Sequence, residues 1–234
     1  MPRPLCLIIG HGPGLGAAYA QAFMDAGYDL ALLSRSGARF EGRAQPGAEV
    51  AASPCDAADP AALSRVLDQV TRDHGPPEVM IYNADLAMFG TLDDLDEAQF
   101  EQSWQVAALG LYTAARKPGR AMAARGSGTI IVSGATAATR GQDWTTAFAP
   151  AKAAQRILAQ SLAKQLGPKG VHVNYILIDG VIDTADTRAD FAKGKPDDFF
   201  IQPARIADTA VMLTRQDRSA WSFEIDLRPF GETW

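Results

Sequence analysis

The chain has 234 residues, of which 47% are hydrophobic and 21% are charged, and its formal net charge is −5. This composition is typical of a globular protein with a sizeable core, and the length suits one large α/β domain. The acidic balance excludes a broad basic face for nucleic acid and a polybasic patch for a membrane surface. No apolar run approaches the length of a membrane span, so we expect a cytoplasmic protein.

Apolar runs alternate with stretches of helical periodicity along the whole chain. We expect strands at Leu5–Ile9, Asp29–Leu33, Val50–Ser53, Val79–Tyr82, Thr129–Ser133, Val171–Ile178 and Trp221–Leu227. We expect helices at Leu15–Ala26, Pro60–Thr71, Glu97–Ala124, Ala147–Leu166 and Pro203–Leu213, the third interrupted near Pro118-Gly119 because proline breaks helices. This alternation predicts a single Rossmann-type domain over residues 1–234. Its mostly parallel, doubly wound sheet should carry helices on both faces.

A glycine-rich loop, Gly10-His11-Gly12-Pro13-Gly14-Leu15-Gly16-Ala17, joins the first strand to the first helix. Glycines permit the sharp turn and let the backbone approach a pyrophosphate, and the helix N-terminus offers free N–H groups. Without a flanking strand and helix, a plain tight turn would be the better interpretation of such a motif. Because a strand precedes it and a helix follows, dinucleotide binding is the better interpretation.

The spacing Gly10-x-x-x-Gly14-x-Gly16 resembles that of the short-chain dehydrogenase/reductase family, and similar segments follow in order along the chain. They are Asp56, Tyr82-Asn83-Ala84-Asp85, Val173-Asn174, Asp179-Gly180 and Ile182-Asp183-Thr184. The resemblance implies that Asp56 contacts adenine and that residues 182–184 contact the nicotinamide carboxamide. The cofactor-binding set that it implies is Gly10, Gly12, Gly14, Leu15, Gly16, Ser34, Arg35, Asp56, Asn83, Ala84, Lys152, Gly180, Ile182 and Thr184.

Some of these side chains have an alternative, local role. Asp56 could cap the following turn, Asn83 could satisfy backbone groups at a strand end, and Thr184 could be an ordinary cap. These local roles are compatible with contact to a cofactor.

The end of the second strand indicates which nucleotide is bound. An NAD-preferring site usually places an acid there for the ribose 2′-hydroxyl, but this chain has Ser34 followed by Arg35. A guanidinium suits a phosphate, whereas a carboxylate would repel it. We therefore predict NADP(H) in preference to NADH, although Arg35 could also be a solvated loop cation.

The resemblance implies catalysis by a Tyr, a Lys four residues later, a Ser and an Asn. Lys152 stands at the lysine position, but Phe148 takes the place of the tyrosine, Ala135 that of the serine and Ala107 that of the asparagine. A phenyl ring and two methyl groups cannot donate a proton or a hydrogen bond to a carbonyl oxygen. Thr136, Tyr112 and Tyr175 are substitute donors, with packing or local bonding as the alternative.

Three hypotheses remain. The chain is an NADP(H)-dependent oxidoreductase of a carbonyl or hydroxyl compound with an altered proton donor, a nucleotide-binding sensor or scaffold, or a non-redox lyase or isomerase on the same fold. Cys6, Cys55 and the scattered histidines have no metal-ligand or disulfide spacing, so no metal and reduced thiols are expected. The last strand and the aromatic tail Arg228–Trp234 favour a homo-oligomer over a tail packed on its own subunit. The polar segment Gly180–Gln202 is expected to be a mobile substrate lid.

Overall fold

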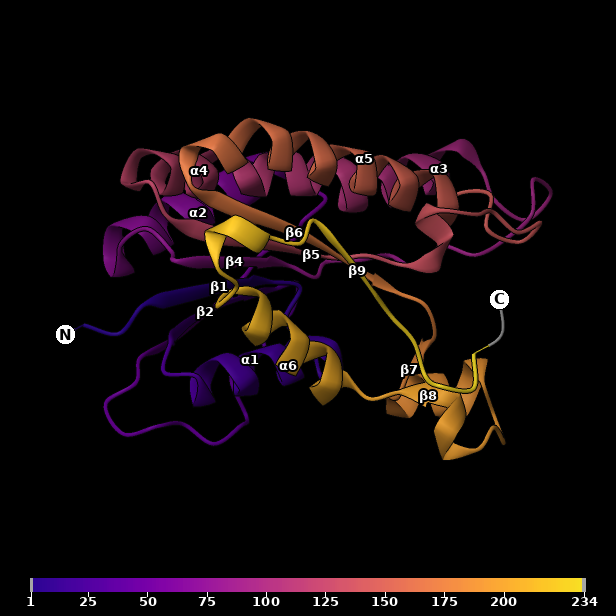
Figure 1. The fold of residues 1–234 in the computed structure, drawn as a ribbon. Coiled ribbons are helices and arrows are strands. Elements are labelled where there is room, and N and C mark those ends of the chain that lie inside the picture. The colour runs from indigo at the N-terminus through magenta and orange to yellow at the C-terminus, as the bar shows by residue number, and fades with distance from the viewer. Residues whose placement is uncertain (1, 233–234) are drawn as a thin grey trace.

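Seven parallel strands form one sheet at the centre of the molecule (Figure 1) in the computed structural model, which describes residues 2–232. The strands are β1 (Leu5–Ile9), β2 (Asp29–Ser34), β3 (Val50–Pro54), β4 (Val79–Tyr82), β5 (Gly128–Ser133), β6 (Val171–Ile178) and β9 (Glu224–Leu227). Their order is β3-β2-β1-β4-β5-β6-β9. The predicted doubly wound Rossmann fold is confirmed, with β1 and β4 at the point where the strand order reverses.

Helices cover both faces of the sheet. They are α1 (Leu15–Asp25), α2 (Pro60–His74), α3 (Glu97–Trp104), α4 (Gly110–Arg125), α5 (Phe148–Leu166) and α6 (Pro203–Leu213). In Figure 1, α1 and α6 lie below the sheet, while α2, α4 and α5 lie above it. Along β1, Leu7 and Ile9 contribute to one hydrophobic core and Cys6 and Ile8 to the other. A strand buried on both faces needs apolar residues at every position, which explains the continuous apolar runs in the sequence.

The interruption of the long helix does not lie where the sequence predicted it. Pro118 and Gly119 are inside α4, and the break is a π-helical turn at Gln105–Leu109. Proline removes one backbone hydrogen bond from α4, but the buried side chains around it hold the helix against the sheet. The prediction was wrong because packing of the apolar face outweighed the local cost of proline.

Two connections carry little regular structure. Residues 35–49, between β2 and β3, contain no helix or strand. The segment after β6 forms a two-stranded parallel sheet from β7 (Val181–Ile182) and β8 (Phe200–Ile201), with a π-helical turn at Thr187–Phe191 between them. Loops of this length in compact domains are usually functional.

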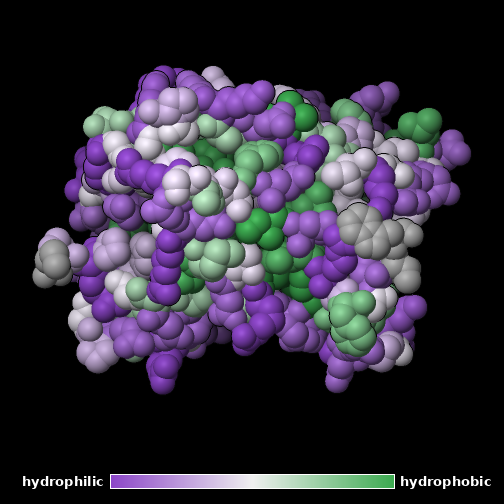
Figure 2. Space-filling model, viewed as in Figure 1, coloured by the Kyte–Doolittle hydropathy of each residue, from purple (hydrophilic) through white to green (hydrophobic). Residues whose placement is uncertain are grey.

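The surface is largely hydrophilic over the outer helices, with hydrophobic residues gathered toward the middle of the face drawn in Figure 2. Cys6 and Cys55 are buried free thiols. Within residues 2–232, no helix is long and apolar enough to cross a membrane. The end of the predicted aromatic tail, Thr233-Trp234, lies outside the described residues.

Candidate nucleotide-binding site

A groove of about 260 Å³ opens at the carboxyl ends of β1 to β4, next to the reversal of strand order. The structure brings into it seven residues that the sequence predicted as cofactor contacts, namely Gly10, Gly12, Ser34, Arg35, Asp56, Asn83 and Ala84. Ligands of open α/β sheets bind at this position because the crossover connections diverge there.

The glycine loop is shaped by a close backbone approach. Gly10 has φ +94°, and a Cβ on it would lie 2.4 Å from the backbone nitrogen of Ala84. The helix α1 then begins after Gly14 without a side-chain cap or an acidic residue in its first turn. The Ala17 N–H donates to the Gly12 carbonyl, but the N–H groups of Leu15 and Gly16 remain for an anion, as a pyrophosphate site requires. Leu15 and Gly16 are buried in this first turn.

The segment after β6 returns to the glycine loop. Gly180 precedes β7, and Ile182 pairs with Ile201 in the small sheet. A Cβ on Gly14 would lie 2.9 Å from Thr184 Cγ2, so Thr184 closes over the start of α1. Gly180, Ile182 and Thr184 thus lie on one segment, which follows β6 and reaches the glycine loop from the other half of the sheet.

The end of β2 presents cations and no carboxylate. Ser34 Oγ accepts a hydrogen bond from the Ala38 backbone at 2.9 Å, which orders the turn. Arg35 and Arg39 are exposed, and neither forms an ion pair within the described part of the chain. The ring of His11 lies 3.4 Å from the Arg39 carbonyl and connects this loop to the glycine loop. Two guanidinium groups beside the groove are therefore free to meet an anion.

Asp56, Asn83 and Thr184 all make the local bonds that the sequence left as alternatives. Asp56 accepts from the Ala58 backbone at 2.9 Å, and Asn83 Nδ2 donates to the Gly10 carbonyl at 2.9 Å. Thr184 Oγ1 accepts from the Thr187 backbone at 3.2 Å. Asp56 and Asn83 nevertheless line the groove, so the local bonds leave them within reach of a ligand.

Lys152, another predicted cofactor contact, is not among the residues that line the groove, and only 1% of its side chain is exposed. Its Nζ donates to the Ser133 carbonyl at 2.9 Å and lies 3.5 Å from Asp85 Oδ2. The sequence pattern places Asp85 in the segment after β4 but predicts no role for it. A carboxylate directly after the predicted cofactor contacts Asn83 and Ala84 was the signal that could have identified it.

Phe148 opens α5, one helical turn before Lys152, and its ring belongs to an aromatic cluster. The Phe89 ring stands edge-on to Phe148 and to Trp144, each at 5.0 Å between centroids. Phe191, from the segment after β6, lies 6.1 Å from Phe89. The surroundings of Phe148, one turn from Lys152, are therefore aromatic.

The two alanines at expected catalytic positions lie in unusual backbone. Ala107 is buried inside the π-helical turn, and its carbonyl accepts a 3.3 Å hydrogen bond from Gln155 Nε2. Ala135 is extended, with φ −152°, just before a short 3₁₀ turn. Neither side chain offers a polar atom to a ligand.

The substitute donors differ in their access to the site. Thr136 Oγ1 donates to Asp179 Oδ1 at 2.5 Å, so its proton is engaged. Tyr112 is 51% exposed beside Arg116 on α4. Tyr175 is fully buried, and burial raises the pKa of its hydroxyl. A buried, hard-to-ionise phenol and an exposed one are both poor replacements for a catalytic tyrosine.

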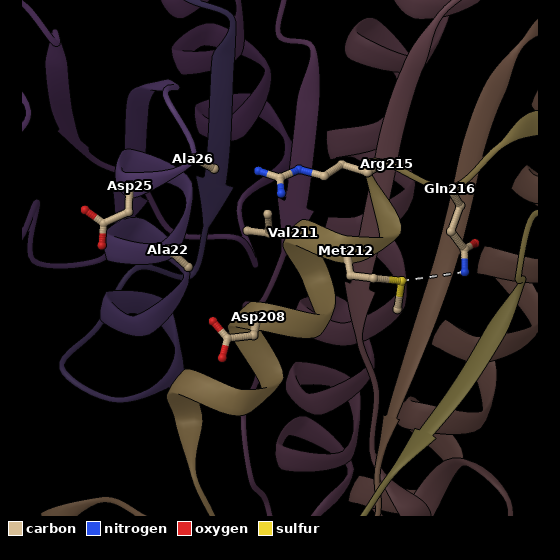
Figure 3. A pocket seen from close by; sticks show the side chains of 8 residues that line it. All are labelled: Ala22, Asp25, Ala26, Asp208, Val211, Met212, Arg215 and Gln216. Carbon is tan, nitrogen blue, oxygen red and sulfur yellow. Dashed lines mark hydrogen bonds between the residues drawn. The ribbon is translucent and has the colours of Figure 1, made fainter.

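A larger hollow, of about 530 Å³, lies between α1 and α6 (Figure 3). Its charged side chains are Asp25, Asp208 and Arg215, and Met212 and Gln216 face each other at its rim. It contains no residue of the glycine loop or of the strand ends. The groove at the carboxyl ends of β1 to β4, although smaller, gathers seven of the predicted residues.

Comparisons with known proteins agree with this geometry. The family model "short chain dehydrogenase" matches residues 5–194. The 3-oxoacyl-(acyl-carrier-protein) reductase MabA of Mycobacterium tuberculosis is 30% identical over 183 residues, which cover 78% of this chain and 71% of that protein. A short-chain dehydrogenase from Rhodopseudomonas palustris superposes with a TM-score of 0.81 at 30% identity, covering 98% of this chain and 100% of that one.

A second solved structure shows a bound nucleotide. The alcohol dehydrogenase of Thermococcus sibiricus, in complex with 5-hydroxy-NADP, superposes with a TM-score of 0.86 at 25% identity. It covers 99% of each chain. Since the family model spans most of the sequence and the fold matches end to end, the chain belongs to the short-chain dehydrogenase family of oxidoreductases.

Proposed function

We propose that the chain binds NADP(H) in the groove at the carboxyl ends of β1 to β4. The observation that carries the proposal is the end of β2, where no acid stands at Ser34 and, among residues 2–232, Arg35 and Arg39 have no ion-pair partner. The uncapped N-terminus of α1 suits the pyrophosphate. The NADP derivative bound by the Thermococcus sibiricus enzyme supports the same class of cofactor.

We further propose that the chain is an oxidoreductase of a carbonyl or hydroxyl compound whose turnover of ordinary substrates is slow. The nicotinamide would supply the hydride chemistry. The chain itself would hold the cofactor through Lys152, but Phe148, Ala135 and Ala107 offer no proton or hydrogen bond to a substrate oxygen. The aromatic cluster around Phe148 would shield the reacting atoms from water and favour an apolar substrate.

Arg35→Ala is expected to weaken NADPH binding about tenfold or more, while NADH binding changes less than about twofold. A hydrogen bond to a charged group contributes about 1.5–3 kcal/mol, and NADH has no 2′-phosphate to lose it. Fluorescence titration of both nucleotides measures the two affinities. Arg72→Ala is the matched control, because Arg72 is an exposed arginine on α2, away from the groove. Wild-type affinity for NADH equal to or above that for NADPH would contradict the proposal.

A further inference from the structure

Residues 181–202 form a small unit that stands apart from the main sheet (Figure 1). Their own sheet consists of β7 and β8, and a two-stranded sheet alone is marginally stable in water. The core holds β8, because Phe200 and Ile201 are buried. Between residues 183 and 199, all of which the structure describes, Ala192 alone is buried. The order of this stretch therefore depends on polar contacts.

Arg188 is the centre of those contacts. It lies in the π-helical turn Thr187–Phe191, and its guanidinium binds both carboxylate oxygens of Asp183, at 2.5 and 2.9 Å. The guanidinium also donates to Asp197 at 2.8 Å, and its Cζ lies 4.4 Å from the centre of the Phe200 ring. One side chain thus joins the residue after β7, the short turn before β8, and β8 itself.

The geometry makes this ion pair stronger than a typical surface pair, because it is bidentate and a second carboxylate shares the guanidinium. Gln202 donates to the same Asp183 carboxylate at 2.7 Å. The hydrogen bonds from Arg188 and Gln202 hold the pKa of Asp183 below its ordinary value, so the carboxylate stays charged. A lysine would reproduce the charge of Arg188 but not its planar fork of donors.

The same turn sets the position of Thr184. Thr187 Oγ1 donates to the Ile182 carbonyl at 2.6 Å and accepts from the Thr184 backbone at 3.0 Å. The Arg188 backbone donates to the Thr184 carbonyl at 3.1 Å. Thr184 in turn closes over Gly14 at the start of α1. Arg188 is therefore connected to the glycine loop through Thr184, although its own side chain does not line the groove.

We propose that Arg188 is the positioning residue of residues 181–202, which it folds over the start of α1 before any nucleotide is bound. Thr184 then meets the nucleotide already in place, so the chain loses less conformational freedom on binding. This consequence rests on the proposed NADP(H) function, whereas the order of the ligand-free segment does not. The alternative is a segment that folds only around the ligand.

Hydrogen–deuterium exchange of the ligand-free chain tests the order. In the wild-type chain the amide of Asp183, which donates to the Ile201 carbonyl at 2.9 Å, should be protected. Arg188→Gln is expected to speed exchange in peptides from residues 181–202 about tenfold, and Arg188→Lys should give an intermediate rate. Peptides from β1 and β5 and the melting temperature should change little, because the residues that bind Arg188 belong to neither hydrophobic core.

Titration of two nucleotides tests the consequence. Arg188→Gln is expected to weaken NADPH about tenfold and to leave 2′,5′-ADP, which carries the adenosine half alone, within about twofold. The reason is that the family resemblance assigns residues 182–184 to the nicotinamide half. Asp183→Asn with Arg188→Gln should cost less than the sum of the single changes, because both remove one ion pair. Arg205→Gln is the matched control, since Arg205 pairs with Asp208 on α6. It should change neither exchange nor affinity.

The outcomes are distinct. Exchange in residues 181–202 that is the same in the wild-type chain and in Arg188→Gln, whether fast or slow, overturns the inference. Faster exchange with unchanged NADPH affinity overturns the link to the nucleotide. Asp183→Asn removes the same ion pair and keeps the comparison available if Arg188→Gln does not fold. A wild-type chain that binds neither nucleotide removes the proposed cofactor function, and the exchange comparison then still decides whether Arg188 orders the segment.

Discussion

The double variant Ala135→Ser with Phe148→Tyr is expected to reduce carbonyl compounds at least ~10²-fold faster than the wild-type chain, the low end for a positioned general acid. Hydride transfer to a carbonyl creates an alkoxide, which needs a proton and a hydrogen-bond donor beside it. Phenylalanine and tyrosine differ by one oxygen, and Lys152 is already one turn away on α5. A nearby ammonium lowers the pKa of a phenol, so the new tyrosine would be poised for proton transfer.

Rates of NADPH oxidation over a panel of aldehydes and ketones measure this gain. The matched control adds Lys152→Met to the double variant, which should lose most of the gain. Ala107→Asn belongs in a separate variant, because the Ala107 side chain is buried within the π-helical turn. Fast turnover by the wild-type chain would contradict the impaired-site proposal and direct mutagenesis to Thr136, Tyr112 and Tyr175.

Gly10→Ala is expected to lower the free energy of unfolding by about 2–6 kcal/mol, the combined range for backbone strain and overpacking. The new methyl group would meet the Ala84 backbone nitrogen at 2.4 Å, and φ +94° is unfavourable for alanine. Neither backbone segment can move without displacing β1 or β4. Denaturant unfolding followed by circular dichroism measures the loss.

Gly12→Ala is the matched control, two residues along the same loop. A Cβ on Gly12 meets no atom within 4 Å, and its φ is not positive. Its free energy of unfolding should therefore change by less than about 1 kcal/mol. Equal losses in the two variants would show that the close approach of Gly10 to Ala84 is not the controlling contact.

Most of the fold could be predicted because each element carries a local signal. The apolar runs of β1 and β4 and the glycine loop between β1 and α1 identify a nucleotide-binding Rossmann sheet before any contact is known. The same local signals located the groove residues from Gly10 to Ala84. Their common feature is that each stands at the carboxyl end of a strand, and strand ends are readable from sequence.

The features that the sequence did not predict depend on contacts between segments far apart in the chain. The break at Gln105–Leu109 leaves no local signature, because it is held by partners on β4 and α5. The pairing of Asp85 with Lys152 joins residues far apart in the chain and appears only when the sheet is assembled. At Pro118 the local signal was strong but wrong. Proline predicted an interruption of the helix, whereas packing of the buried side chains keeps α4 continuous through it.

The π-helical turn at Gln105–Leu109 also sets the rotational phase of the helix that follows. A widened turn frees backbone carbonyls, and here Tyr82 Oη donates to Val106 at 2.5 Å while Gln155 takes the carbonyl of Ala107. A π turn holds one residue more than an α turn, and each residue rotates a helix by about 100°. Deleting a single residue there would swing the buried face of α4 away from the sheet, whatever residue was removed. The length of this segment therefore fixes which face of α4 packs on the sheet.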